Sequence, residues 1–139
     1  MIYTVAVVGA GLLGGVYAAF STMVVPGLRR LDDRAATAAM VRINLQAERG
    51  PFIVLFGIAA LAAVGVIVNA VPRGAVSEIA VAGASLASTV LTVAVNVPLN
   101  RRLEKDGSAF WPMYARRWTA ANTVRAVGAT AAVIVAAMR

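Results

Sequence analysis

The sequence predicts an all-α fold, an integral membrane four-helix bundle with an interfacial amphipathic helix after the first span. Hydrophobic residues make up 60% of the 139 residues and charged residues only 14%, whereas soluble domains average about 45–50% and about 25%. The apolar residues are also clustered. No Asp, Glu, Lys or Arg occurs in residues 1–28, 50–72 or 79–100, and residues 118–138 contain a single one, Arg125. Each stretch reaches the roughly 20 residues that a helix needs to cross a bilayer.

These stretches define the elements in order. A chain in lipid must satisfy its backbone hydrogen bonds internally, so continuous apolar runs predict helices. We expect one domain, residues 1–139, with spans at about 3–25, 51–71, 78–98 and 118–138. A short turn at 72–77 makes the second and third spans antiparallel neighbours. We expect a polar loop at 101–108, then a helix that starts near Phe110 and continues into the fourth span.

Residues 29–49 carry the pattern of the interfacial helix. Asp32 or Asp33 suits its N-cap, and Gly50 with Pro51 ends it. Basic residues lie on the opposite side from an apolar face, as in helices that lie at a membrane surface. The residues of that face are Ala36, Met40, Ile43, Asn44 and Ala47.

The distribution of the basic residues behind the net charge of +7 indicates how the chain is oriented in the membrane. Eleven of the 13 basic residues fall in two segments on the same side of a four-span protein. The positive-inside rule places these segments in the cytoplasm and both termini outside, in a bacterial-type inner (plasma) membrane. We therefore expect contact with lipid headgroups and no nucleic acid partner. The eleven are Arg29, Arg30, Arg34, Arg42 and Arg49, then Arg101, Arg102, Lys105, Arg116, Arg117 and Arg125.

The chain contains no cysteine and no histidine. Disulfides, thiol chemistry and Cys/His metal sites are therefore excluded, and no histidine can act as a base. The six acidic residues are scattered along the sequence, so a carboxylate metal site is not expected either. We expect no metal and no cofactor.

Gly9, Gly11 and Gly14 form a G-x-G-x-x-G pattern, with Asp32 about where a ribose-binding acid would stand in a dinucleotide fold. The 20-residue apolar runs leave no short strands for such a sheet. We expect instead that small residues, such as Gly11 and Gly15, let membrane helices approach closely.

Polar side chains form stripes at helical spacing within the apolar spans. The third span carries Ser85, Thr89, Thr92, Asn96 and Asn100; the fourth carries Trp111, Tyr114, Trp118, Asn122 and Arg125; the amphipathic helix adds Asn44 and Glu48. Buried polar groups in lipid usually face the bundle, so the stripes predict a pocket at the cytoplasmic end. A fixed cation, amides and an aromatic wall suit a flat organic anion. Alternatively, the hydroxyls bond to their own helices, the Asn side chains hold helices together and Arg125 snorkels to the headgroups.

Four segments of the chain resemble the anthrone oxygenase-like membrane family, which consists mostly of bacterial four-span proteins of unknown function. N-x-P-L-N and W-x-x-x-N-x-x-R are the most specific pieces. The segments are Phe20-Ser-Thr-Met-Val-Val-Pro-Gly-Leu28, Met40-Val-Arg-Ile-Asn44, Val95-Asn-Val-Pro-Leu-Asn100 and Trp118-Thr-Ala-Ala-Asn-Thr-Val-Arg125.

The resemblance implies oxidation of an anthrone to an anthraquinone by molecular oxygen, without metal or flavin. Arg125 and the Asn122 amide would hold the enolate, and Glu48 or Tyr114 would take the proton. Asn44, Asn96, Asn100 and Trp118 would bind the substrate. A non-catalytic role, as a lipid-binding protein or complex subunit, stays open. A small transporter is a third reading, which the lack of acids deep in any span disfavours. The oligomeric state is open.

Overall fold

The computed structural model describes residues 1–138, and every regular element in them is a helix. The all-α class is confirmed, and the absence of strands from these residues removes the dinucleotide-binding alternative. The elements are α1 (Ile2–Ala19), η1 (Phe20–Val24), α2 (Val25–Leu28), α3 (Asp33–Arg49), α4 (Pro51–Ala70), η2 (Val71–Arg73), α5 (Val76–Leu91), η3 (Thr92–Asn96), α6 (Val97–Asp106), η4 (Gly107–Phe110) and α7 (Trp111–Ala137).

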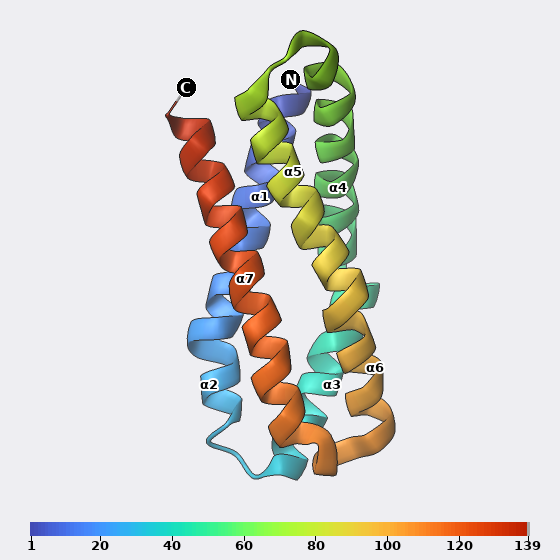
Figure 1. Ribbon diagram of the computed structural model, residues 1–139. Helices are drawn as coiled ribbons and strands as arrows, with labels where there is room; N and C mark the ends of the chain where they lie inside the picture. The colour runs from blue at the N-terminus through green and yellow to red at the C-terminus, as the bar shows by residue number, and fades with distance from the viewer. Residues whose placement is uncertain (139) are drawn as a thin grey trace.

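The long helices α1, α4, α5 and α7 form the bundle (Figure 1). Helix α7 packs on α1 and α5, and α4 packs on the same two helices. The chain termini and the turn between α4 and α5 lie at one end (Figure 1). The other end is built from α2, α3, α6 and η4, together with the turn after α2 and the first part of α7. These segments contain most of the basic residues, and this end is called the basic end below.

Three helical stretches within residues 1–138 are long and apolar enough to cross a membrane: Ile2–Leu28, Pro51–Arg73 and Val76–Ala137. The third stretch contains α5, α6 and α7, and Figure 1 shows it turning back between α6 and α7. Gly107 stands at that turn with φ of 68°, a conformation that glycine adopts without steric cost. These helices fit a membrane protein, and the count of four spans stays a prediction.

The expected loop at residues 101–108 is wrong, because α6 continues as a helix through Asp106. Arg102 and Asp106 form an ion pair of 2.9 Å at helical i,i+4 spacing, which supports this last turn. Leu103 is fully buried between them, so packing also favours the helix. The expected N-cap is confirmed: an oxygen of the Asp32 side chain accepts from the backbone N–H groups of Arg34 and Ala35.

Close approach of helices at small residues is confirmed, but at other glycines than expected. A Cβ on Gly9 would stand 2.8 Å from Cβ of Ala59 on α4, and one on Gly14 would stand 2.8 Å from Cβ of Ala129 on α7. A Cβ on Gly15 would meet nothing within 4 Å, and one on Gly11 would only touch a valine methyl at 3.7 Å. The face that α1 turns toward its neighbours therefore differs from the expected one.

Prolines explain two π-helical segments. Pro26 follows η1 and Pro98 follows η3. A proline has no N–H to donate to the carbonyl four residues earlier, and its ring crowds that carbonyl. The backbone responds here with a wider turn, in which each N–H reaches one residue further back. Both segments lie where α1 and α5 enter the basic end (Figure 1).

A hydrophobic cluster fills the basic end itself. Its buried members come from α2, α3, α6, η4 and α7, so one core ties these elements together. We call it the basic-end core. It consists of Val25, Ala36, Met40, Leu103, Phe110, Trp111, Tyr114, Ala115 and Trp118.

Candidate functional site

A cavity of about 390 Å³ lies beside the basic-end core, which shares Trp118 with it. Ligand sites for drug-sized molecules occupy about 300–1,000 Å³. The cavity is lined mainly by apolar and aromatic side chains with a small set of polar ones. The lining residues are Val16, Tyr17 and Phe20; Ile43, Asn44, Ala47 and Glu48; Phe52, Ile53 and Phe56; Thr92, Val93, Asn96, Val97 and Asn100; and Trp118, Asn122 and Arg125.

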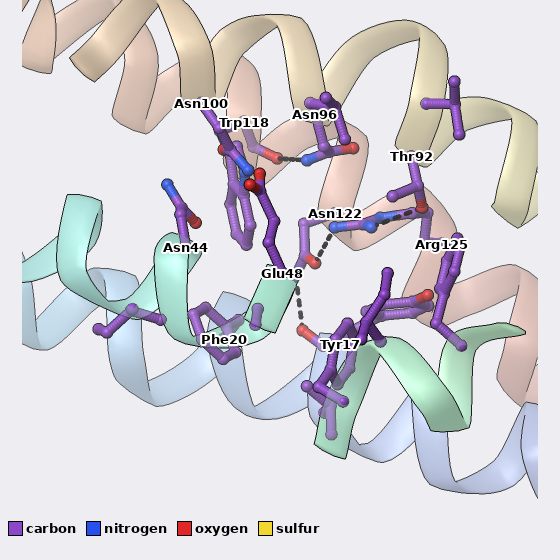
Figure 2. Close-up of a pocket in the computed structure, with 18 residues that line it drawn as sticks. Tyr17, Phe20, Asn44, Glu48, Thr92, Asn96, Asn100, Trp118, Asn122 and Arg125 are labelled. Carbon is purple, nitrogen blue, oxygen red and sulfur yellow. Dashed lines mark hydrogen bonds between the residues drawn. The ribbon is translucent and has the colours of Figure 1, made fainter. Parts of the chain in front are cut away.

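Seven of the eight site residues expected from the sequence line this cavity (Figure 2). They come from three separate segments: Asn44 and Glu48 from α3, Asn96 and Asn100 from η3 and α6, and Trp118, Asn122 and Arg125 from α7. Tyr114 is the exception, since it lies in the basic-end core behind the cavity wall. The helical stripes therefore do converge, as their spacing predicts.

Arg125 is held inside the bundle and does not reach toward a surface. Its side chain is 5% exposed. One terminal nitrogen, Nη1, donates to Oγ1 of Thr92 at 2.8 Å, and the other, Nη2, donates to Oδ1 of Asn122 at 2.7 Å. Its guanidinium carbon lies 4.2 Å from the ring centre of Tyr17 (Figure 2). The snorkelling alternative is wrong for this side chain.

The charge of Arg125 has only neutral partners. The two ion pairs within residues 1–138 join Arg73 to Glu78 and Arg102 to Asp106, so neither includes Arg125. Its Nε is buried and has no partner in the described part of the chain. A buried cation without a counter-ion is costly. The site is therefore electrostatically matched to an anion.

Asn122 positions Arg125 and has little left to offer a ligand. Its amide nitrogen donates to the main-chain oxygen of Tyr17 at 2.6 Å and to Oγ of Ser21 at 2.7 Å. Its amide oxygen accepts from Arg125. The residue is fully buried. Asn122 thus ties α7 to α1 and turns its oxygen toward the guanidinium.

The amides nearer the basic end form a chain of hydrogen bonds. The hydroxyl of Tyr114 donates to Oδ1 of Asn100 at 2.9 Å and accepts from Nδ2 of Asn44 at 3.3 Å. Tyr114 precedes the fourth expected span, and burial raises its pKa. The phenol therefore keeps its proton at neutral pH and serves as a donor, which disfavours it as a base.

Besides Nε of Arg125, two polar atoms at the cavity wall have no hydrogen-bond partner among residues 1–138. They are Oδ1 of Asn96 and Nε1 of the Trp118 indole. The amide nitrogen of Asn96 donates to the main-chain oxygen of Trp118 at 3.4 Å. Buried polar groups are normally paired, so these unpaired atoms favour a site that accepts a polar guest.

Glu48 stands at the edge of the cavity and is exposed. It is the single acidic residue among the lining residues. Figure 2 shows its side chain extending from α3 toward Asn100 and the Trp118 ring. A carboxylate in this position can exchange protons with the surroundings and with a guest in the cavity.

Two further residues, Tyr17 and Thr92, belong to the surroundings of Arg125. Thr92 shares the stripe of Asn96, and its Oγ1 accepts from Arg125. Tyr17 gives a main-chain oxygen to Asn122 and its ring face to Arg125, and no side-chain pattern reveals a main-chain acceptor. For Ser85, Thr89 and Thr92 the alternative reading is confirmed, because each hydroxyl donates to the carbonyl four residues earlier. Thr92 differs from the other two because it also accepts from Arg125.

A protein-family model described as "Anthrone oxygenase" matches residues 40–135. The match covers more than half of the chain, from the second half of α3 to near the end of α7. A comparison with curated proteins gives no match, and neither does one with solved structures.

Proposed function

The chain belongs to the anthrone oxygenase family, and we propose that its cavity is a cofactor-independent oxygenase site for a flat, hydrophobic aromatic substrate of the anthrone class. The single observation that carries this proposal is the buried guanidinium of Arg125 beside a largely apolar cavity of about 390 Å³. An anthrone is apolar as a whole and develops one negative charge when its enolate forms. The cavity offers both environments.

The proposed reaction needs no redox group from the protein. The substrate loses a proton from the methylene carbon opposite its ketone, and the enolate passes one electron to O₂. The resulting carbon radical and superoxide combine to form a C–O bond, and protonation gives a hydroperoxide. Loss of water breaks the O–O bond and forms the second carbonyl. One anthrone and one O₂ thus yield one anthraquinone and one water.

The residues of this chain have three roles in the proposed reaction. Arg125, held by Thr92 and Asn122, stabilises the enolate oxygen with a charge that needs no reorganisation during the reaction. Glu48 accepts the first proton and can return it to the peroxide oxygen. The aromatic wall of Tyr17, Phe20 and Trp118 holds the flat rings and keeps bulk water away.

The test is oxidation of anthrone by purified protein in lipid nanodiscs, followed by the absorbance of the quinone. Formation should depend on the protein and on O₂, and it should survive treatment with a chelator. Quinone formation no faster than in empty nanodiscs would reject the enzyme. Activity lost with chelator and regained with one metal would reject the cofactor-free route.

A second candidate is a non-catalytic membrane protein that binds a lipophilic anion. The observation in its favour is the number of polar groups bonded to one another, including Asn44, Asn100, Tyr114 and Asn122. Such a set can serve as a rigid binding site without any chemistry. Saturable binding of anthraquinone without oxidation of anthrone would favour this candidate.

A further inference from the structure

Three residues mark where the cavity reaches the surface. Of all the lining residues within the described chain, only Glu48, Ile53 and Val93 are exposed. Ile53 is 45% exposed and Val93 is 59% exposed. They belong to α3, α4 and η3. The opening, called the mouth below, therefore lies at the side of the bundle, between the α3–α4 junction and η3.

The mouth is apolar on two of its edges. Ile53 and Val93 lie in the charge-free stretches 50–72 and 79–100, and Ile53 belongs to Pro51–Arg73, a helix apolar enough to cross a membrane. Exposed aliphatic side chains at such positions face hydrocarbon. Glu48 lies just before Gly50-Pro51, where α3 ends and α4 begins. This is the boundary between the charged segment 29–49 and the charge-free stretch 50–72.

The basic end of the bundle is filled by side chains, so water does not reach the cavity from that end. The basic-end core lies there, and its members Met40, Leu103 and Tyr114 are fully buried. The hydrogen bonds of Tyr114 with Asn44 and Asn100 seal the layer between this core and the cavity. On the remaining sides the lining residues are buried or half-buried.

We propose that the substrate enters the cavity sideways from the lipid, through the mouth, and that it does so as a neutral, membrane-dissolved weak acid. This inference rests on the proposed function for what happens inside, but the route itself does not depend on catalysis. A neutral aromatic acid dissolves in hydrocarbon, whereas an anion does not. Glu48 at the mouth repels anions, and Arg125 inside favours them. The negative charge therefore forms only after the molecule has passed Glu48.

The substrate class follows from this order of events. Molecules must be neutral in the membrane and able to lose a proton inside. Amphiphiles with a permanent negative charge are excluded, even when their ring system fits. Anthraquinone and anthraquinone-2-sulfonate test this, because they share one ring frame and differ in a fixed charge. We expect the sulfonate to associate with the cavity at least tenfold more slowly than anthraquinone, although Arg125 would favour its charge once it is bound.

The route is tested without any substrate by thiol labelling, since the chain has no cysteine of its own. Asn96 is 2% exposed and lines the cavity, so a thiol at this position is reached only through the cavity. In nanodiscs, Asn96→Cys should react with lipid-soluble N-phenylmaleimide and resist an impermeant sulfonated thiosulfonate. Narrowing the mouth with Ile53→Phe and Val93→Phe together should slow the maleimide about tenfold.

Matched control positions exist on the same helices, α4 and α5 with its continuation η3. Val54 and Val90 are 60% and 64% exposed and do not line the cavity, so Val54→Phe with Val90→Phe should leave the labelling rate unchanged. All four positions are exposed, and circular dichroism with gel filtration checks that each variant is folded. Equal slowing by both pairs would overturn the route.

The outcomes separate the route from the reaction. Rapid labelling of Asn96→Cys by the impermeant reagent, or no slowing by the mouth pair, overturns lateral access whatever the oxidation assay gives. Mouth-dependent labelling in a protein that oxidises no anthrone leaves the route standing and rejects the oxygenase. Association of the sulfonate as fast as that of anthraquinone overturns the neutral substrate class.

Discussion

Nη2 of Arg125 donates to Oδ1 of Asn122 at 2.7 Å, one helical turn earlier on α7. The amide nitrogen of the same Asn122 is anchored by two hydrogen bonds, one to the Tyr17 carbonyl of α1 and one to the Ser21 hydroxyl of η1. The guanidinium is therefore fixed by a neutral acceptor that is itself fixed. A cation held in this way keeps its full charge for a guest, which an internal carboxylate would not allow.

Arg125→Lys tests the need for the planar fork. A lysine ammonium cannot reach Thr92 and Asn122 in the same geometry, so the charge remains while its position is lost. We expect anthrone oxidation to fall by roughly 100-fold, as for loss of a preorganised oxyanion donor, with little change in folding. Arg117→Lys, on the exposed face of the same helix, is the control. Equal activity of the two variants would show that Arg125 acts only as a charge in the bundle.

Thr92→Val removes the acceptor for Nη1 of Arg125 and keeps the shape of the side chain. An N–H group buried without its partner costs about 1–3 kcal/mol, so the protein should lose thermal stability as well as activity. Thr89→Val is the matched control. Among the described residues the Thr89 hydroxyl bonds to the Ser85 carbonyl alone, and the Thr92 hydroxyl makes the same bond to Ser88 besides its bond with Arg125. The two melting temperatures, measured in the same detergent, decide the point. A Thr89 variant as unstable as the Thr92 variant would contradict the special role of Thr92.

Much of this arrangement is predictable from the sequence, because spacing fixes which side chains share a helix face. The steps of three and four residues predict that Asn96, Trp118, Asn122 and Arg125 lie on inward stripes, and all four line the cavity. The rotation of a helix about its axis is not fixed by spacing. The choice of Gly11 and Gly15 as contact points failed for that reason, since Gly9 and Gly14 make the contacts.

Two other features depended on groups that side-chain patterns do not show. The main-chain oxygen of Tyr17 accepts from Asn122, and a carbonyl is present at every position, so nothing marks this one. The segment 101–108 looked like a loop because it is polar, yet it is helical. The helix is stabilised there by the ion pair of Arg102 with Asp106 on its polar face and by the burial of Leu103 on the other.

Glu48→Gln and Tyr114→Phe distinguish the two candidate bases. Because burial raises the pKa of Tyr114, the phenol holds its proton and should not be the acceptor. We expect Glu48→Gln to lower the oxidation rate by roughly 100-fold, the usual range for loss of a general base. Tyr114→Phe should leave the rate within a few-fold of wild type, measured under saturating anthrone. The reverse pattern would assign the base to Tyr114.

The raised pKa of Tyr114 also predicts a dependence of stability on pH. The folded state keeps the phenol protonated beyond the point, near pH 10, where an unfolded tyrosine ionises. Stability linked to Tyr114 is thus complete below about pH 10 and is lost as pH rises above it. Tyr114→Phe should reduce this alkaline loss in thermal unfolding curves. An identical alkaline profile in the variant would show that another group controls it.

Gly14→Ala tests the closest contact between α1 and α7. Its new Cβ would stand 2.8 Å from Cβ of Ala129 and 3.9 Å from Cα of the same residue, so the helices must separate. Overpacking of this kind costs about 1–3 kcal/mol. Gly15→Ala adds the same methyl where nothing lies within 4 Å and should be neutral or slightly stabilising. The difference in unfolding free energy between the two variants measures the contact, and a difference near zero would contradict it.

The last prediction concerns orientation in the membrane. Eleven of the 13 basic residues belong to segments that meet at or near the basic end, and the positive-inside rule then places that end in the cytoplasm. Lys105 lies at the basic end and Gly74 at the opposite turn, and both are exposed. In intact cells an impermeant thiol reagent should label Gly74→Cys, while Lys105→Cys should react only after the membrane is opened. The lack of native cysteine makes both signals specific. Labelling of Lys105→Cys alone from outside would reverse the orientation, and the mouth would then face the outer leaflet.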